Sequence, residues 1–358
     1  MKSESIALLR DLCELPGPPS CEDRVIDYMR SALQPCADEV IQDRLGGTFG
    51  VRRSSAPDAP KVMLAGHMDE VGFIVSRIDS DGLVGFKPLG GWWSQTLLSQ
   101  RVTVHADGGD LTGVISTRAI RQDLSADLKS RALEIDDMII DVGAQNAAHA
   151  ARLGLRPGVF VTPQSDFVRL GGGSRLLGKA FDNRYGCATA IDAMRALASD
   201  DLPCHLYAGA TVQEEGGLRG ALPAARLIQP DLFIALDSSA ARDVSGKPGE
   251  LGRLGEGFLL RVFDSRMRPD RALIDFTRKL AEEHGIRYQW FFSHGTTDAA
   301  AVQTSGIGVP TLVLGIACRY NHSHTAIIDT ADYDASLAIV VELVRRFDAA
   351  TVRGLTCR

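Results

Sequence analysis

The hydrophobic pattern of this chain changes twice, close to residue 71 and close to residue 162, and these changes limit the folds that it can adopt. Beyond Gly178, segments with the apolar spacing of helices alternate with short apolar runs. This alternation predicts an α/β fold, with a central, mostly parallel sheet that carries helices on both faces. The predicted elements of this part are helices at 183–198, 220–228, 271–284, 298–304 and 333–347 and strands at 205–212, 232–236, 258–263, 288–292 and 311–316.

The block between the two changes has a different pattern. Short β-type runs such as FIVSRI, RVTVHAD and MIIDVGA are separated by Gly and Asp turns, with one short helix expected at 147–153. This pattern is typical of a small barrel or sandwich and does not fit βαβ units. The apolar run at 62–65 needs the later sheet for pairing, so the block is predicted to be an insertion. We therefore expect one domain from residues 1–71 and 163–358 and a β-rich inserted domain at 72–162.

The N-terminal part carries one clear helix signal. Ser20 and Asp23 have the spacing of a helix start, and the apolar residues from Val25 to Leu33 continue the helix. The segment between this helix and the run at 62–65 is interpreted as a charged connector.

The composition is that of an ordinary globular protein with a sizeable core. The 358 residues are 45% hydrophobic and 23% charged, and the formal net charge is -6. Binding to a nucleic-acid backbone requires a basic surface, so no nucleic-acid partner is expected. The chain has no apolar run of signal-peptide or membrane-spanning length, so we expect a cytoplasmic protein without a membrane partner. Seven cysteines without Cys-x-x-Cys spacing indicate neither a disulfide framework nor a thiolate zinc site.

Five places along the chain combine a strand end with side chains that can bind a metal. Ligands collect at the carboxyl ends of parallel strands, because the loops there converge on one crevice. Taken alone, each place could be a helix N-cap, a turn or an ordinary surface residue. Those interpretations do not explain why all five places have the same direction, with the metal-binding residue at the carboxyl end of its strand. The residues are His67 with Asp69, Asp182, the pair Glu214 and Glu215, Asp237, and His322, with His324 as the competitor of His322.

The donor atoms of this set favour a metal centre. Two neutral imidazoles and three carboxylates suit two divalent cations that share one carboxylate. Asp69 lies two residues after His67, on the same side of an extended chain, and could accept the second imidazole N–H.

Glu214 and Glu215 are adjacent and are therefore expected to differ in role. Neighbouring side chains of an extended segment point in opposite directions. One glutamate would hold metal, while the other would face the substrate and accept a proton from a metal-activated water. Amide hydrolysis fits this combination of groups.

Six motifs resemble those of metallopeptidase family forty-two, the glutamyl and deblocking aminopeptidases that form tetrahedral dodecamers. The likeness covers nearly the whole chain, including the insertion. It implies a phosphorylase/hydrolase-like dinuclear zinc peptidase fold whose inserted β-rich domain mediates assembly. It also implies that the protein removes N-terminal residues from short or unfolded peptides as a homo-oligomer, up to a dodecamer. The motifs are AGHMDEVGFIV, GKAFDNRYGCA, TVQEEGGLRGA, ALDSS, GTTDAA and RYNHSH.

The resemblance implies a role for each candidate residue. Two divalent cations, zinc or cobalt, would be bound per chain, and a glutamate would act as the general base. The implied roles are a bridging ligand for Asp182, ligands of one cation for His67 and Asp237, ligands of the other for Glu215 and His322, the general base for Glu214, and an orienting group for Asp69.

Two positions depart from the family pattern. Ala326 stands where relatives usually have a glutamate, and Phe258 stands where many have a proline beside the side-chain pocket. The metal-binding set is intact, so these departures concern the substrate. The pair Thr297 and Asp298 is retained, and by itself it indicates a helix N-terminus.

Other functions are compatible with parts of this pattern. A metal-dependent amidase or deacylase acting on a small modified amino acid would use the same centre with a changed pocket. A non-catalytic shell-forming relative should have lost a ligand or the base, and none is missing. A glycosidase needs two carboxylates and no metal, which would leave the histidines without a role.

Overall fold

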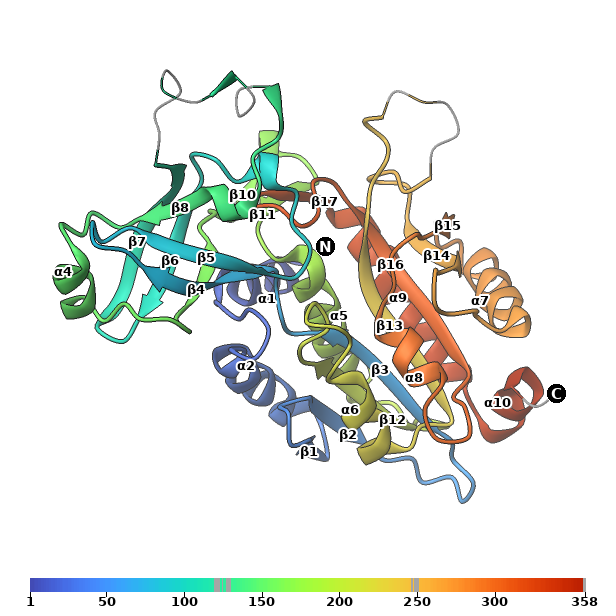
Figure 1. The fold of residues 1–358 in the computed structure, drawn as a ribbon. Helices are drawn as coiled ribbons and strands as arrows, with labels where there is room; N and C mark the ends of the chain where they lie inside the picture. The colour runs from blue at the N-terminus through green and yellow to red at the C-terminus, as the bar shows by residue number, and fades with distance from the viewer. Residues whose placement is uncertain (119–122, 124, 127–129, 246, 248–250, 357–358) are drawn as a thin grey trace.

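An eight-stranded mixed sheet forms the centre of the larger, α/β part of the molecule (Figure 1). The computed structural model describes residues 1–118, 123, 125–126, 130–245, 247 and 251–356. In order across the sheet, the strands are β1 (Glu39–Gln42), β2 (Thr48–Arg52), β12 (His205–Thr211), β3 (Lys61–His67), β13 (Leu232–Ala240), β16 (Thr311–Cys318), β14 (Phe258–Phe263) and β15 (Tyr288–Phe292). The four central strands, from β12 to β16, pair in parallel, which confirms the predicted α/β class.

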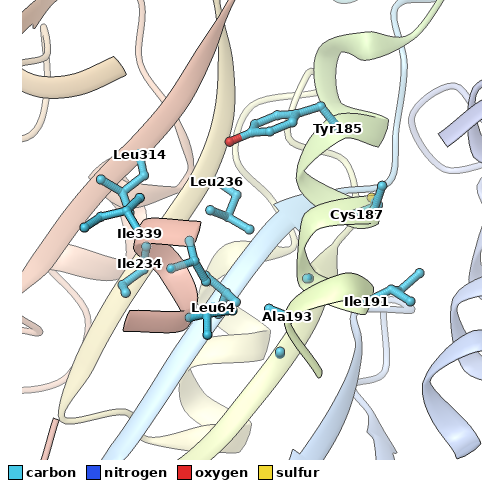
Figure 2. Close-up of a cluster of buried hydrophobic side chains, with 14 of the residues drawn as sticks. Leu64, Tyr185, Cys187, Ile191, Ala193, Ile234, Leu236, Leu314 and Ile339 are labelled. Carbon is cyan, nitrogen blue, oxygen red and sulfur yellow. The ribbon is translucent and has the colours of Figure 1, made fainter. Parts of the chain in front are cut away.

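Helices cover both faces of this sheet, as predicted. They are α1 (Ser3–Glu14), α2 (Asp23–Leu33), α5 (Phe181–Ala196), α6 (Ala221–Ile228), α7 (Arg271–Glu283), α8 (Asp298–Gln303), α9 (Thr330–Arg346) and α10 (Ala349–Thr356). Along β3, Val62 and Leu64 join the hydrophobic cluster of α1, α2, α5, α7 and α9, whereas Met63 and Ala65 join the cluster of α6 and α8. Successive side chains of a strand point to opposite faces, so a strand buried on both faces is apolar throughout. Figure 2 shows Leu64 of β3 in the first cluster, near Ala193 of α5.

A closed six-stranded barrel lies to one side of the α/β part, at the left of Figure 1. Its interior holds a hydrophobic cluster of its own, which includes Phe73, Phe86 and Val161. The predicted barrel or sandwich is therefore a barrel, and the domain boundaries of 72–162 stay a prediction. In order around the barrel, the strands are β4 (Gly72–Ile78), β5 (Val84–Leu89), β8 (Met138–Asp141), β7 (Gly109–Thr117), β6 (Arg101–Ala106) and β9 (Phe160–Pro163), and the short helix is α4 (Ala147–Arg152).

A small antiparallel sheet and four single-turn helices complete the described elements. The small sheet consists of β10 (Val168–Arg169), β11 (Arg175–Gly178) and β17 (Ala326–Asp329). The single-turn helices are η1 (Gln34–Cys36), η2 (Ser94–Thr96), η3 (Ile135–Asp137) and η4 (Leu170–Gly172).

The structure contains elements that the sequence analysis missed, and one strand is longer than predicted. The charged connector contains β1 and β2, whose hairpin turn is held by Asp43, which accepts the amides of Leu45, Gly46 and Gly47. Helix α1 was not predicted, and α10 follows the helix that was expected to close the chain. β13 extends to Ala240, so Asp237 lies within the strand and not after it.

Two expectations drawn from composition can be compared with the described residues. The thiols of Cys13, Cys21, Cys36, Cys187, Cys204 and Cys318 are free, and Cys357 lies outside the described residues. Among the residues that the structure describes, no helix combines the length and the apolar character needed to cross a membrane.

The close approach of β3 to α5 at two glycines gives a stability prediction. A methyl group on Gly66 would lie 2.6 Å from the carbonyl carbon of Gly186 and 2.7 Å from the amide nitrogen of Cys187. Because backbone atoms cannot move aside like a side chain, we expect Gly66→Ala to lower the free energy of unfolding by about 3 kcal/mol in urea titrations. Gly354→Ala is the control, since nothing lies within 4 Å of an added methyl group there. The control should raise stability by up to about 1 kcal/mol, and an unchanged Gly66→Ala variant would disprove the close contact.

Candidate active site

The predicted site residues converge at the carboxyl ends of the four central parallel strands. His67 ends β3, Asp237 lies near the end of β13, and the glutamate pair follows β12. His322 follows β16, and Asp182 lies in the first turn of α5. A cavity of about 610 Å³ opens over this edge of the sheet. Its walls include His67, Asp182, Glu214, Glu215, Asp237 and His322.

Three groups of these side chains could hold metal ions. Each group offers ligand atoms that lie within 4.8 Å of one another, and the groups are His67 with Asp182 and Asp237, Asp182 with Glu215 and His322, and His67 with Glu214 and Glu215. The first two groups share Asp182. Its Oδ1 lies 3.2 Å from Nε2 of His67, and its Oδ2 lies 3.4 Å from Nε2 of His322. The two oxygens of one carboxylate therefore face two different imidazoles.

The electrostatics of the site fit a bound cation. Burial raises the pKa of Glu214 and of Asp237 well above their ordinary values. Burial also acts to raise the pKa of Asp182, but hydrogen bonds with His322 and His67 outweigh this and hold it below its ordinary value. Burial acts to lower the pKa of His322, yet its hydrogen bonds to Asp182 and Glu215 raise it overall to about 11. Burial thus disfavours the negative charge of Glu214 and Asp237, and a divalent cation would offset that cost when it binds.

Both histidines are oriented through the ring nitrogen that faces away from Asp182. Nδ1 of His67 lies 3.1 Å from the backbone oxygen of Asp69 and 3.3 Å from its Oδ1. Nδ1 of His322 lies 2.9 Å from the backbone oxygen of Gly91, which belongs to the loop after β5 of the barrel. A carbonyl oxygen can only accept, so each Nδ1 donates, and each Nε2 faces the carboxylates and would bind a cation once its proton is lost. The barrel thus helps to orient one side chain of the site.

The two glutamates differ in direction, but the expected reason was wrong. β12 ends at Thr211, and Glu214 and Glu215 lie in a turn instead of an extended segment. Oε2 of Glu214 lies 3.8 Å from Nε2 of His67, and Oε1 of Glu215 lies 2.9 Å from Nε2 of His322. The carboxylate of Asp69 accepts both of their backbone amides, each at 2.9 Å. Asp69 therefore contacts both His67 and the turn at residues 212–220 that carries the two glutamates, called the glutamate turn below.

Some contacts of the site were not predicted. The side-chain amide of Asn321 donates to Oδ2 of Asp182, and Oε1 of Glu22 accepts the backbone amide of Gln213 at 3.0 Å. Asn321 stands next to His322 in the motif RYNHSH, so the sequence held a signal for it. Glu22 and Gly91 lie far along the sequence from their partners Gln213 and His322, and no motif or residue spacing in the sequence points to these contacts.

The positions that competed with the site or departed from the family pattern lie outside the cavity lining. His324 is buried against Trp92, with ring centroids 5.6 Å apart, so it does not compete with His322. Phe258 is buried in β14 and packs beside Tyr288, and Ala326 is buried at the start of β17. Thr297 caps α8, its hydroxyl accepting the amide of Ala299.

Comparison with known proteins identifies the family. Residues 46–339 match the model of the family described as M42 glutamyl aminopeptidase. The chain is 35% identical over 329 residues to the glutamyl aminopeptidase of Lactococcus lactis, across 91% of each chain. It is 32% identical over 340 residues to the lysyl aminopeptidase of Pyrococcus furiosus, across 94% of this chain and 96% of the relative.

Solved structures agree with this assignment. The TET aminopeptidase of a marine sediment archaeon of the Thaumarchaeota superposes with a TM-score of 0.96 at 36% identity, over 99% of this chain and 100% of that chain. The TET1 peptidase of Pyrococcus horikoshii, which can assemble into a tetrahedron or a large octahedral shell, superposes with a TM-score of 0.85 at 26% identity, over 96% of this chain and 100% of that chain. The chain thus belongs to the M42 family of aminopeptidases, which are peptide-bond hydrolases.

Proposed function

We propose that this protein is a dinuclear metal-dependent aminopeptidase in which Asp182 bridges two divalent cations. The observation that carries the proposal is that the two oxygens of Asp182 face different histidines, at 3.2 and 3.4 Å. Asp237 would complete the site of His67, and Glu215 that of His322. Mixed nitrogen and oxygen donors without thiolates suit zinc or cobalt.

Glu214 is the general base in this proposal. The cations, when bound, would polarise the scissile carbonyl and lower the pKa of the attacking water. The carboxylate of Glu214 lies in the cavity wall, and burial raises its pKa well above the ordinary value. A carboxylate in this position can take a proton from water and return it to the leaving amine. Asp69 holds the amide of Glu214 and the ring of His67, so it aligns the base with the centre.

Separate substitutions of Glu214 and Glu215 distinguish the general base from the metal ligand. Glu214→Gln should lower kcat by about 10²- to 10⁴-fold and keep the metal content, because it removes a base without removing a ligand. Glu215→Gln and His67→Ala should lose metal, measured by inductively coupled plasma mass spectrometry after gel filtration. Metal loss in Glu214→Gln with retention in Glu215→Gln would reverse the assignment. An active Glu214→Gln variant would refute the base altogether.

We further propose that the enzyme prefers an acidic N-terminal residue. Three arginines, Arg242, Arg261 and Arg266, line the cavity. Arg261 is buried and donates to Ser239 at 2.8 Å and to Asp264 at 3.1 Å, so its position is fixed. The acidic side chains among the described lining residues are the three carboxylates of the proposed metal centre and the proposed base, Glu214. Because Arg261 is paired with Asp264, the exposed guanidinium of Arg266 is the group proposed to bind a substrate carboxylate, in the matched geometry of such pairs.

Paired substrates test this preference. We expect kcat/KM for a glutamyl p-nitroanilide to exceed that for the lysyl compound by at least about tenfold, and Arg266→Ala to reduce this ratio several-fold, with a weaker effect at high salt. An N-acetylated glutamyl anilide is the control for a free amino terminus. A preference for the lysyl substrate would refute the proposed preference for an acidic residue, and faster release from the acetylated compound would support a deacylase instead.

We also propose that the protein acts as a homo-oligomer, with a shell of up to twelve copies. Support comes from the similarity to the TET1 peptidase, which can assemble into a tetrahedron or a large octahedral shell. Multi-angle light scattering measures the assembly directly, and a monomer at micromolar concentration would contradict the proposal.

A further inference from the structure

Three successive backbone amides of the glutamate turn donate to carboxylates from distant parts of the chain. The amides of Glu214 and Glu215 donate to the two oxygens of Asp69. The amide of Gln213, one residue earlier, donates to Oε1 of Glu22 at 3.0 Å. Asp69 also contacts His67, but nothing so far explains why a buried glutamate should hold Gln213.

The geometry of the turn explains the need for an outside acceptor. Gln213 has a φ of 56°, in the left-handed region that residues with side chains seldom adopt. The carbonyl oxygens of Val212, Gln213 and Glu214 are satisfied within the turn, by the amides of Gly220, Arg219 and Leu218, respectively. The amides at the start of the turn point the other way, so their acceptors come from other segments. Glu22 and Asp69 supply those acceptors.

Glu22 is well placed to be a rigid acceptor. It directly precedes α2, and its carbonyl oxygen accepts the amides of Val25 and Ile26 at 2.8 and 2.9 Å. Its backbone is therefore fixed by the start of a helix that packs in the core through Val25 and Met29. The residue is only 3% exposed, and its side chain reaches across to the turn. A fixed helix start thus holds the first amide of the turn in place.

We propose that Glu22 is a positioning residue for the general base. Through the amide of Gln213, it fixes the left-handed start of the turn and thereby the direction in which Glu214 enters the cavity. This inference rests on the proposed role of Glu214. It assigns Glu22 no contact with substrate or metal, so its effect is expected in kcat and not in metal content or KM.

Two substitutions at Glu22 test the proposal in the full-length, metal-loaded protein. Glu22→Ala removes the acceptor, and we expect kcat on the preferred aminoacyl anilide to fall about 10- to 100-fold, because a small misplacement of a catalytic group has an effect of that size. KM and metal content should stay within about twofold of the parent. Glu22→Gln keeps an oxygen acceptor of the same length, so its kcat should return to within about threefold of the parent.

A matched control separates positioning from a general loss of packing. Asp192 is a buried carboxylate that accepts the hydroxyl of Tyr333 at 2.8 Å, away from the turn. Asp192→Ala should lower the melting temperature without a comparable fall in kcat. If Glu22→Ala does not fold, Glu22→Asp, which withdraws the acceptor by one methylene, should fold and show an intermediate kcat.

The outcomes distinguish this inference from the proposed function. A parent-like kcat in Glu22→Ala, equal losses in the Ala and Gln variants, or loss of metal in either would overturn the positioning role. Glu214→Gln is measured in parallel. If that variant stays active, the proposed base itself is wrong, whereas an inactive Glu214→Gln beside a normal Glu22→Ala refutes only the inference about Glu22.

Discussion

Four carboxylates of low exposure lie within reach of two imidazoles at one edge of the sheet, and the rest of the site depends on how their charge is balanced. Like charges repel strongly where water is excluded, and a buried carboxylate without a partner is costly. The raised pKa values of Glu214 and Asp237 express that cost. The arrangement of Asp182, with one oxygen toward each histidine, suggests two positions where cations would balance it.

The fold brings these groups together through its topology. Four parallel strands end at the same edge, and the loops that follow them carry side chains from segments far apart in the chain. The close packing of Gly66 on Gly186 brings β3 and α5 together, so that His67 meets Asp182. The barrel adds the carbonyl oxygen of Gly91, which orients His322. The site is therefore shared between the sheet and the barrel.

Much of this architecture was predictable, because helices and strands each impose a characteristic spacing of apolar residues along the sequence. Alternating helical and strand patterns predicted the α/β part, and regularly spaced short runs predicted the barrel. The candidate ligands that follow β3, β12, β13 and β16 could be found because each lies at or near the end of an apolar run, whereas Asp182 lies in the first turn of α5. Asp237 was recognised for this reason even though β13 continues past it to Ala240.

The remaining features depend on contacts that local sequence does not encode. β1 and β2 are short, and the charged residues around them hid their pairing at the sheet edge. The turn at Glu214 was taken for an extended segment, because its left-handed start at Gln213 has no glycine to mark it. Glu22 with Gln213, and Gly91 with His322, are contacts between segments nearly 200 or more positions apart. Only the folded chain shows them.

The central claim is that Asp182 lies between two cations, and anomalous X-ray scattering tests it most directly. Crystals of the protein grown with zinc, with data collected on both sides of the zinc absorption edge, should show two peaks that flank this carboxylate. One peak should lie beside His67 and Asp237, and the other beside Glu215 and His322. A single peak, or peaks that avoid Asp182, would contradict the account.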